Sequence, residues 1–163
     1  MNAAYLFLLF AVPLASIAAQ PARVSREADA SGCQREWERF GDSCYGFGRE
    51  NVTWPDAMSM CRAFQGYLVE INSKAENDWL VSQLKTRKFS HTWLGASDMM
   101  KEGVFRWMTN NVPVGKVPYF HPGQPDNREQ GEQCLEIDAT MYMWADDECL
   151  YTKRFVCEKS VTV

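Results

Sequence analysis

The chain has 163 residues, of which 46% are hydrophobic and 23% are charged, and this composition excludes a disordered chain. Its 17 Lys and Arg against 21 Asp and Glu give a net charge of −4. Because binding to phosphate needs a basic excess, we expect neither nucleic acid nor an anionic membrane surface as a partner. The length predicts one domain. Six cysteines against two histidines favour disulfides over a Cys/His zinc site.

The first 32 residues predict a leader and a linker. Ala3 to Ala19 is an apolar run without a charged side chain, interrupted by Pro13 and ending in small residues. It is shorter than the roughly 20 uninterrupted apolar residues of a spanning helix, so we expect a signal peptide over residues 1–19 and no membrane insertion. Residues 20–32 contain no large apolar residue except Val24 and are expected to be a flexible linker. Secretion into an oxidising compartment would allow the cysteines to pair.

Two capping patterns predict helices. Thr53 with Asp56, and Ser73 with Glu76, have the spacing in which an N-cap side chain and an acidic side chain three residues later satisfy free backbone N–H groups. The first helix should start at Trp54, with Trp54, Ala57, Met58 and Cys61 on its buried face. The second should run to about Lys85 and bury Trp79, Leu80 and Leu84.

Short strand-like segments follow the helices. A first strand is expected between the helices at Tyr67 to Ile71, and the later ones are Thr92 to Ala96, Val104 to Met108, Cys134 to Asp138 and Arg154 to Glu158. Helices first and strands later predict an α+β fold. Thr109 to Gln133 reads as an unusually long loop, and such loops commonly carry function. All cysteines and tryptophans lie in residues 33–158, the expected folded domain, which leaves residues 159–163 as a tail.

Several motifs occur in the order that marks C-type lectin domains, and the chain resembles that family from Cys33 to Glu158. They are Trp93-Leu94-Gly95, Gln124-Pro125-Asp126, and Trp144 followed by Cys149 and Cys157. The resemblance implies the C-type lectin-like fold, with two helices, antiparallel sheets and a long ligand-binding loop stapled by disulfides. It also implies the pairs Cys33–Cys44, Cys61–Cys157 and Cys134–Cys149, which six cysteines alone would leave open.

The long loop carries the candidate ligands. Gln124 and Asp126 flank Pro125, so an extended backbone places both side chains on one side. In the family this proline is cis, and Glu132 and Asp146 match the remaining carboxylate positions. These four residues would supply part of the roughly six to eight oxygens that Ca²⁺ takes, and a sugar's hydroxyls could complete the set. The resemblance therefore implies that the same four residues bind calcium and carbohydrate.

The triplet also suggests which sugar is bound. In the family Gln-Pro-Asp goes with galactose-type ligands, whereas Glu-Pro-Asn goes with mannose-type ones. Two positions depart from the pattern, because Ala145 stands where the family has Asn, and Arg128 stands where galactose binders commonly have an aromatic residue. We expect weaker calcium binding than in members with the full set, with Asp147 or a water as a candidate substitute.

The resemblance also points to a weaker second calcium site. Asp98 and Glu102 match its first acidic pair, whereas Asn127 and Gln133 replace the expected aspartates. A neutral amide oxygen is a poorer calcium ligand than a carboxylate, so solvated loop acids are the competing interpretation. The same alternative, an ordinary acidic turn, applies to the cluster at Asp146.

The resemblance implies a secreted, extracellular lectin that binds glycans on microbial or host surfaces. It leaves two roles open, recognition of microbial sugars in innate immunity and attachment to an extracellular or mineralising matrix. The alternative is a C-type lectin-like domain that binds protein, mineral or extracellular matrix without sugar, for which Ala145 and Arg128 are the supporting features. No enzyme is expected, since nothing places a carboxyl in an apolar pocket that would raise its pKa. With all cysteines paired internally, an oligomer would be non-covalent. Asn51-Val52-Thr53 is a glycosylation sequon.

Overall fold

The computed structural model describes residues 30–115, 117–128 and 131–161, so the expected signal peptide and most of the linker lie outside the described residues. Two helices and eight strands occur in these ranges. In chain order they are β1 (Glu38–Phe40), β2 (Ser43–Phe47), α1 (Trp54–Ala63), β3 (Tyr67–Leu68), α2 (Lys74–Thr86), β4 (Thr92–Ser97), β5 (Arg106–Trp107), β6 (Glu132–Asp138), β7 (Met143–Glu148) and β8 (Arg154–Ser160). The predicted α+β class is confirmed. No helix among the described residues is both long and apolar enough to cross a membrane.

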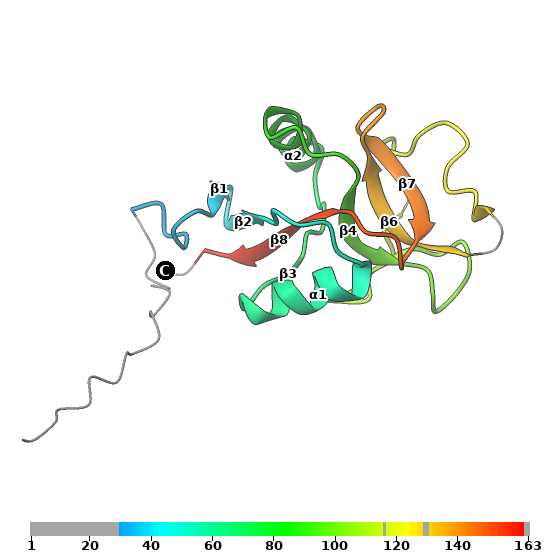
Figure 1. Cartoon of the computed structure of the whole chain (residues 1–163), viewed down its shortest axis with the longest axis horizontal. Coiled ribbons are helices and arrows are strands. Elements are labelled where there is room, and N and C mark those ends of the chain that lie inside the picture. The colour runs from blue at the N-terminus through cyan, green and yellow to red at the C-terminus, as the bar shows by residue number, and fades with distance from the viewer. Residues whose placement is uncertain (1–29, 116, 129–130, 162–163) are drawn as a thin grey trace, which may run out of the picture.

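The strands form one mixed sheet in the order β1-β2-β8-β4-β6-β7, with β3 on β8 and β5 on β4. The β4–β8 pair is parallel, whereas the other pairs among these eight strands are antiparallel. The expected antiparallel sheets are therefore one mixed sheet. Helices α1 and α2 lie on either side of the central strands β8 and β4 (Figure 1). The hairpin β1–β2 is at one end of the molecule, while β6, β7 and the long loop are at the other.

The helices form where the capping patterns place them. Thr53 Oγ1 accepts a hydrogen bond from Asp56 N at 3.3 Å, and Ser73 Oγ accepts one from Glu76 N at 3.1 Å. Each cap satisfies a backbone N–H that has no partner inside its helix. The buried residues Trp54, Ala57 and Cys61 form the inner face of α1. In α2, Leu80 and Leu84 are buried on the inner face. Both predicted helices are therefore confirmed.

The prediction that helices precede strands is wrong. Hairpin β1–β2 comes before α1, and β7 was not predicted as a strand. These short strands acquire their order from distant partners, because β2 pairs with β8 from Ser43↔Ser160 to Phe47↔Val156. The same pairing carries β8 to Ser160, beyond the expected domain end at Glu158. Strand β3 is two residues long instead of five, since only Tyr67 and Leu68 pair with β8.

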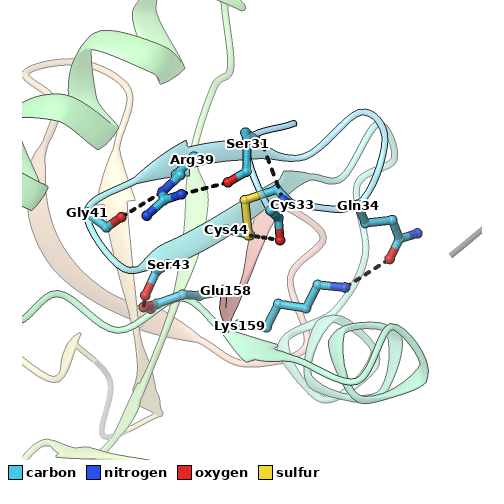
Figure 2. Close-up of a disulfide and its surroundings, with 10 residues drawn as sticks. Ser31, Cys33, Gln34, Arg39, Gly41, Ser43, Cys44, Glu158 and Lys159 are labelled. Carbon is cyan, nitrogen blue, oxygen red and sulfur yellow. Dashed lines mark hydrogen bonds between the residues drawn. A yellow bond between two sulfur atoms is a disulfide. The ribbon is translucent and has the colours of Figure 1, made fainter. Parts of the chain in front are cut away.

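Three disulfides connect the elements, and they are the pairs that the resemblance implies. Cys61–Cys157 ties α1 to β8 across 96 residues of sequence, and closing a loop of that size stabilises the fold by roughly 4 to 5 kcal/mol in the chain-entropy treatment. Cys134–Cys149 joins β6 to the residue after β7. Figure 2 shows Cys33–Cys44, which fastens the start of the described chain to β2 beside Ser43 and Glu158.

Candidate calcium and ligand-binding site

The candidate site lies where the long loop returns to the β6–β7 pair. Glu132 is the first residue of β6, and Asp146 lies in the middle of β7. The loop is fastened to Asp146 by two backbone donors, because Asp126 N lies 3.0 Å from Asp146 Oδ1 and Asn127 N lies 2.8 Å from Oδ2. Asp146 is 4% exposed, so this buried carboxylate fixes the position of the loop that carries Asp126.

Three carboxylates meet at this point. One side-chain oxygen each of Asp126, Glu132 and Asp146 lies within 4.8 Å of the others. Gln124 joins them, since its Nε2 donates to Asp126 Oδ1 at 3.1 Å, and the Gln124–Pro125 peptide bond is cis. The four residues named from the sequence are therefore gathered in one place, although they are spread over 23 positions of the chain.

The electrostatics of the group favour a cation. Burial raises the pKa of the Asp146 carboxyl, and hydrogen bonds from the backbone of Asn127 and Asp126 oppose this effect. Burial also raises the pKa of Glu132, with further contributions from Asp126 and Asp146. The cation that pairs with this group is the exposed Arg128, whose Nη2 lies 3.7 Å from Asp126 Oδ2. Among the described residues, the three carboxylates therefore have little compensating charge, and a cation between them would reduce their mutual repulsion.

An oxygen without a partner tests whether calcium fits. Gln124 Oε1 is buried and has no hydrogen-bond partner among the residues that the structure describes, and the Gln124 side chain contacts Asp126. A buried carbonyl oxygen that makes no hydrogen bond is costly, and oxygen coordination to a cation would remove that cost. Calcium takes carboxylate and amide oxygens, so the donor set fits this ion. Gln124, Asp126, Glu132 and Asp146 are the residues that would hold it.

The missing ligand is not replaced by Asp147. Ala145 is 6% exposed and offers no side-chain oxygen. The next carboxylate, Asp147, is paired through Oδ2 with Lys153 Nζ, and its Oδ1 accepts a hydrogen bond from Glu148 N at 2.8 Å. Lys153 is itself buried and also lies 2.8 Å from Glu136 Oε2. Sequence reasoning missed this lysine, because nothing in the local pattern marks it as buried. The expectation that Asp147 compensates for Ala145 is not supported.

The expected second site is less complete. Asp98 is 2% exposed, and its Oδ2 accepts a hydrogen bond from Gly103 N at 2.9 Å, whereas its Oδ1 has no partner within the described part of the chain. Burial raises the pKa of this carboxyl. Glu102 is exposed, and Asn127 Oδ1 already accepts a hydrogen bond from Glu132 N at 3.2 Å. Within the described ranges, neither Asp98 nor Glu102 belongs to the three-carboxylate group.

The sequon residue Asn51 is exposed just before α1. Thr53 of the same tripeptide caps α1, and its hydroxyl donates to Asp56 Oδ2 at 2.6 Å. Exposure leaves the asparagine accessible, so glycosylation of Asn51 stays a prediction.

Comparison with known proteins defines the family. Residues 50–159 match the Lectin C-type domain, and the chain belongs to this family. A perlucin-like protein of Mytilus galloprovincialis is 33% identical over 121 residues, which cover 72% of this chain and 76% of that protein. Asialoglycoprotein receptor 2 of Mus musculus is 36% identical over 132 residues, or 78% of this chain and 42% of the receptor. The chain spans about two fifths of the length of the mouse receptors that it matches.

Solved structures give the same result. The mouse scavenger receptor C-type lectin carbohydrate-recognition domain superimposes with a TM-score of 0.74 at 31% identity, covering 80% of this chain and 100% of that domain. The C-type lectin-like fold expected from the motifs is therefore confirmed. Membership of this lectin domain family agrees with the expectation that the domain is not an enzyme.

Proposed function

We propose that the protein is a secreted, calcium-dependent carbohydrate-binding protein with a galactose-type preference. The observation that carries this proposal is the convergence of Asp126, Glu132 and Asp146 within 4.8 Å, beside the unpartnered oxygen of Gln124. The names of the relatives support it, since one is an asialoglycoprotein receptor and another is a carbohydrate-recognition domain. The order of amide and acid in Gln124-Pro125-Asp126 supports the galactose type.

The residues of the site divide the work of binding. Bound calcium would supply coordination positions that two neighbouring sugar hydroxyls can fill. Asp126 and Glu132 present carboxylate oxygens that accept hydroxyl protons, and the Gln124 amide presents a donor at its Nε2. Asp146 accepts hydrogen bonds from two backbone N–H groups of the loop and therefore holds the loop in place. Each sugar hydroxyl would thus meet both a metal position and a protein group, which couples the two ligands.

A second candidate function is binding of protein, mineral or extracellular matrix without sugar. Ala145 supports it, because it lacks the side-chain oxygen of the family's asparagine and Asp147, which pairs with Lys153, does not supply one instead. Arg128 supports it too, because its guanidinium lies 3.7 Å from the Asp126 carboxylate and supplies positive charge there without a metal. The two functions differ in their need for calcium.

A calcium titration of the oxidised chain by calorimetry tests the proposal. We expect a dissociation constant in the range of extracellular sites, on the order of 10⁻⁴ to 10⁻³ M. Asp126→Ala should weaken it by at least about 10-fold, because a carboxylate ligand is lost. Asp42→Ala, which removes an exposed carboxylate in the β1–β2 turn, is the matched control and should change nothing. Galactose should then bind in calcium and be released by a chelator. If no calcium binds even at concentrations about 10-fold above this range, the lectin proposal is overturned and the second candidate remains.

The proposal includes where the protein acts and how it is assembled and modified. A secreted lectin would meet glycans on microbial or host surfaces, and innate immune recognition is the role we propose. All six cysteines are in internal disulfides, so an oligomer that multiplies weak sites would be non-covalent. We include glycosylation at Asn51, and a weaker second calcium site at Asp98, Glu102 and Asn127, for which the unpartnered Asp98 Oδ1 is the support. Mass spectrometry of protein collected from culture medium tests secretion and glycosylation together.

A further inference from the structure

A hollow of about 430 Å³ opens beside the candidate site. Its walls come from the first part of the long loop, up to Pro125, and from the segment just before the loop. The side chains that line it are mainly Val104, Phe105, Pro113, Val114, Val117 and Phe120. Gln124 and Pro125 complete the lining, so the hollow is continuous with the triplet that carries the candidate calcium ligands.

The lining selects for an apolar occupant. Among the described residues that line the hollow, Gln124 is the one with a polar side chain, and none is charged. Pockets of roughly 300 to 1,000 Å³ with mostly apolar walls and few polar groups are typical of small-molecule sites. Val104 and Val117 are half-buried, so each keeps surface that an occupant would remove from water. Burial of that surface favours an uncharged hydrocarbon group.

The hollow is held rigidly relative to the carboxylates. On one wall, Val114 N donates to Phe105 O at 2.9 Å. On the other, Trp144 N donates to Tyr119 O and His121 N donates to Trp144 O, each at 2.8 Å, while the Phe120 ring packs edge-on against Trp144 at 5.7 Å. Trp144 belongs to β7, the strand that also carries Asp146. The wall at Phe120 and the cluster of carboxylates around Asp146 are therefore both fixed to β7.

We propose that this hollow is an aglycone subsite, which binds an uncharged alkyl or aryl group attached to the sugar. The inference rests on the proposed function, because the sugar is what brings the group to the hollow. Gln124 links the two parts, since it lines the hollow and donates to Asp126 at 3.1 Å. A glycoside whose hydroxyls lie at the carboxylates therefore has its substituent next to an apolar surface. The protein selects glycosides with a hydrophobic aglycone over the free sugar.

Two glycosides that differ only in the aglycone test the subsite. Methyl β-galactoside and hexyl β-galactoside are titrated into the full oxidised chain in saturating calcium. We expect the hexyl compound to bind roughly 10- to 50-fold more tightly, the change that burial of two or three methylene groups produces. Val104→Asp places a charge in the hollow and should remove this advantage while leaving the methyl compound unchanged. Val112→Asp is the matched control, because Val112 is 51% exposed and does not line the hollow.

The outcomes separate the subsite from the proposed function. Equal affinities for the two glycosides would overturn the subsite while the lectin function stands. An advantage that survives Val104→Asp, or that is lost equally in Val112→Asp, would also overturn it, because the apolar contact would then lie elsewhere. If neither glycoside binds although calcium does, the lectin proposal fails, and the subsite fails with it. A hexyl advantage that Val104→Asp alone removes, and that disappears with a chelator, supports the inference.

Discussion

Ser43 Oγ donates a hydrogen bond of 2.7 Å to Glu158 Oε1, which joins β2 to β8 across 115 residues of sequence (Figure 2). Glu158 is 3% exposed, and its other oxygen accepts from Glu70 N at 3.2 Å. Glu70 and Glu76 are buried beside it, and the Tyr45 hydroxyl donates to Glu76 Oε1 at 2.7 Å. The core near the N-terminal hairpin thus contains three carboxyl groups. Burial raises the pKa of Glu158 to about 7, and the charge of Glu76 adds to that shift against the hydrogen bond from Ser43.

This raised pKa predicts that stability falls as the pH rises from about 4.5 to about 7. In that range the folded chain keeps the proton on Glu158 while the unfolded chain loses it, so unfolding releases a proton and higher pH favours it. A difference of this size corresponds to at most about 3 kcal/mol of unfolding free energy. Urea denaturation of the calcium-free chain across this range measures it. Glu158→Gln should flatten the profile, whereas the exposed control Glu36→Gln should not. Parallel profiles for Glu158→Gln and the unchanged chain would refute the assignment.

Restoring the missing amide should strengthen the site. Ala145→Asn adds a side-chain oxygen on β7 next to Asp146, where the structure offers none. We expect calcium affinity to rise about 10-fold, since an additional neutral oxygen ligand completes more of the shell. Calorimetric titration measures the change, and galactose affinity should rise with it. Ala145→Leu has a similar size but no oxygen and is the matched control. If both variants bind calcium equally, position 145 does not reach the ion.

Removing the competing cation should have a smaller effect. Arg128 Nη2 lies 3.7 Å from Asp126 Oδ2, and the arginine side chain is 73% exposed. An exposed ion pair is worth at most about 1 kcal/mol, so Arg128→Gln should tighten calcium binding by no more than about 5-fold. Because salt screens exposed charges, the gain should shrink between low and high ionic strength. Arg49→Gln, which removes an exposed arginine paired with Glu36, serves as the control. A loss of calcium affinity in Arg128→Gln would show that the guanidinium helps to shape the loop.

The helices could be predicted from the sequence because their signals are local, and the residues that the structure gathers at the candidate site could be named because they match motifs of the family. Thr53 and Ser73 cap their helices through bonds to residues three positions away, and the triplet around Pro125 is a contiguous motif. The hairpin β1–β2 could not be predicted in the same way, since its strands are ordered by β8 more than 100 residues later. Short strands without a regular alternation carry little signal of their own.

The chemistry around the ligands depended on tertiary contacts. Nothing in the sequence near Asp147 shows that Lys153 pairs with it, or that Glu136 lies on the other side of that lysine. The burial of Glu158 was equally hidden, because its position next to Cys157 looks like an ordinary strand end. The hollow beside Gln124 arises only when the segment around Val104 and Phe105 packs beside the first part of the long loop. Motifs therefore named the candidate ligands, whereas the charged groups that surround them became visible only in the fold.

The buried lysine gives a prediction about stability. Lys153 is 5% exposed and lies between Asp147 and Glu136, whose Oε2 is 2.8 Å from Lys153 Nζ. In Lys153→Met, Glu136 stays buried, and the His91 ring at 3.1 Å is the partner that remains for its charge among the described residues. Breaking a buried pair in this way costs about 3 to 5 kcal/mol. Urea denaturation of the calcium-free chain at neutral pH measures this loss as a lower unfolding midpoint.

A double variant separates the lost charge from the lost packing. Lys153→Met with Glu136→Gln contains no unpaired carboxylate at position 136, so it should recover a large part of the stability that Lys153→Met loses. Lys85→Met removes a lysine from the last turn of α2, near the Tyr142 ring at 5.0 Å, and is the control for loss of a surface charge. If the double variant is no more stable than Lys153→Met alone, the cost comes from the other contacts of the Lys153 ammonium, the pair with Asp147 and the Trp93 ring 4.8 Å from Nζ, and not from Glu136.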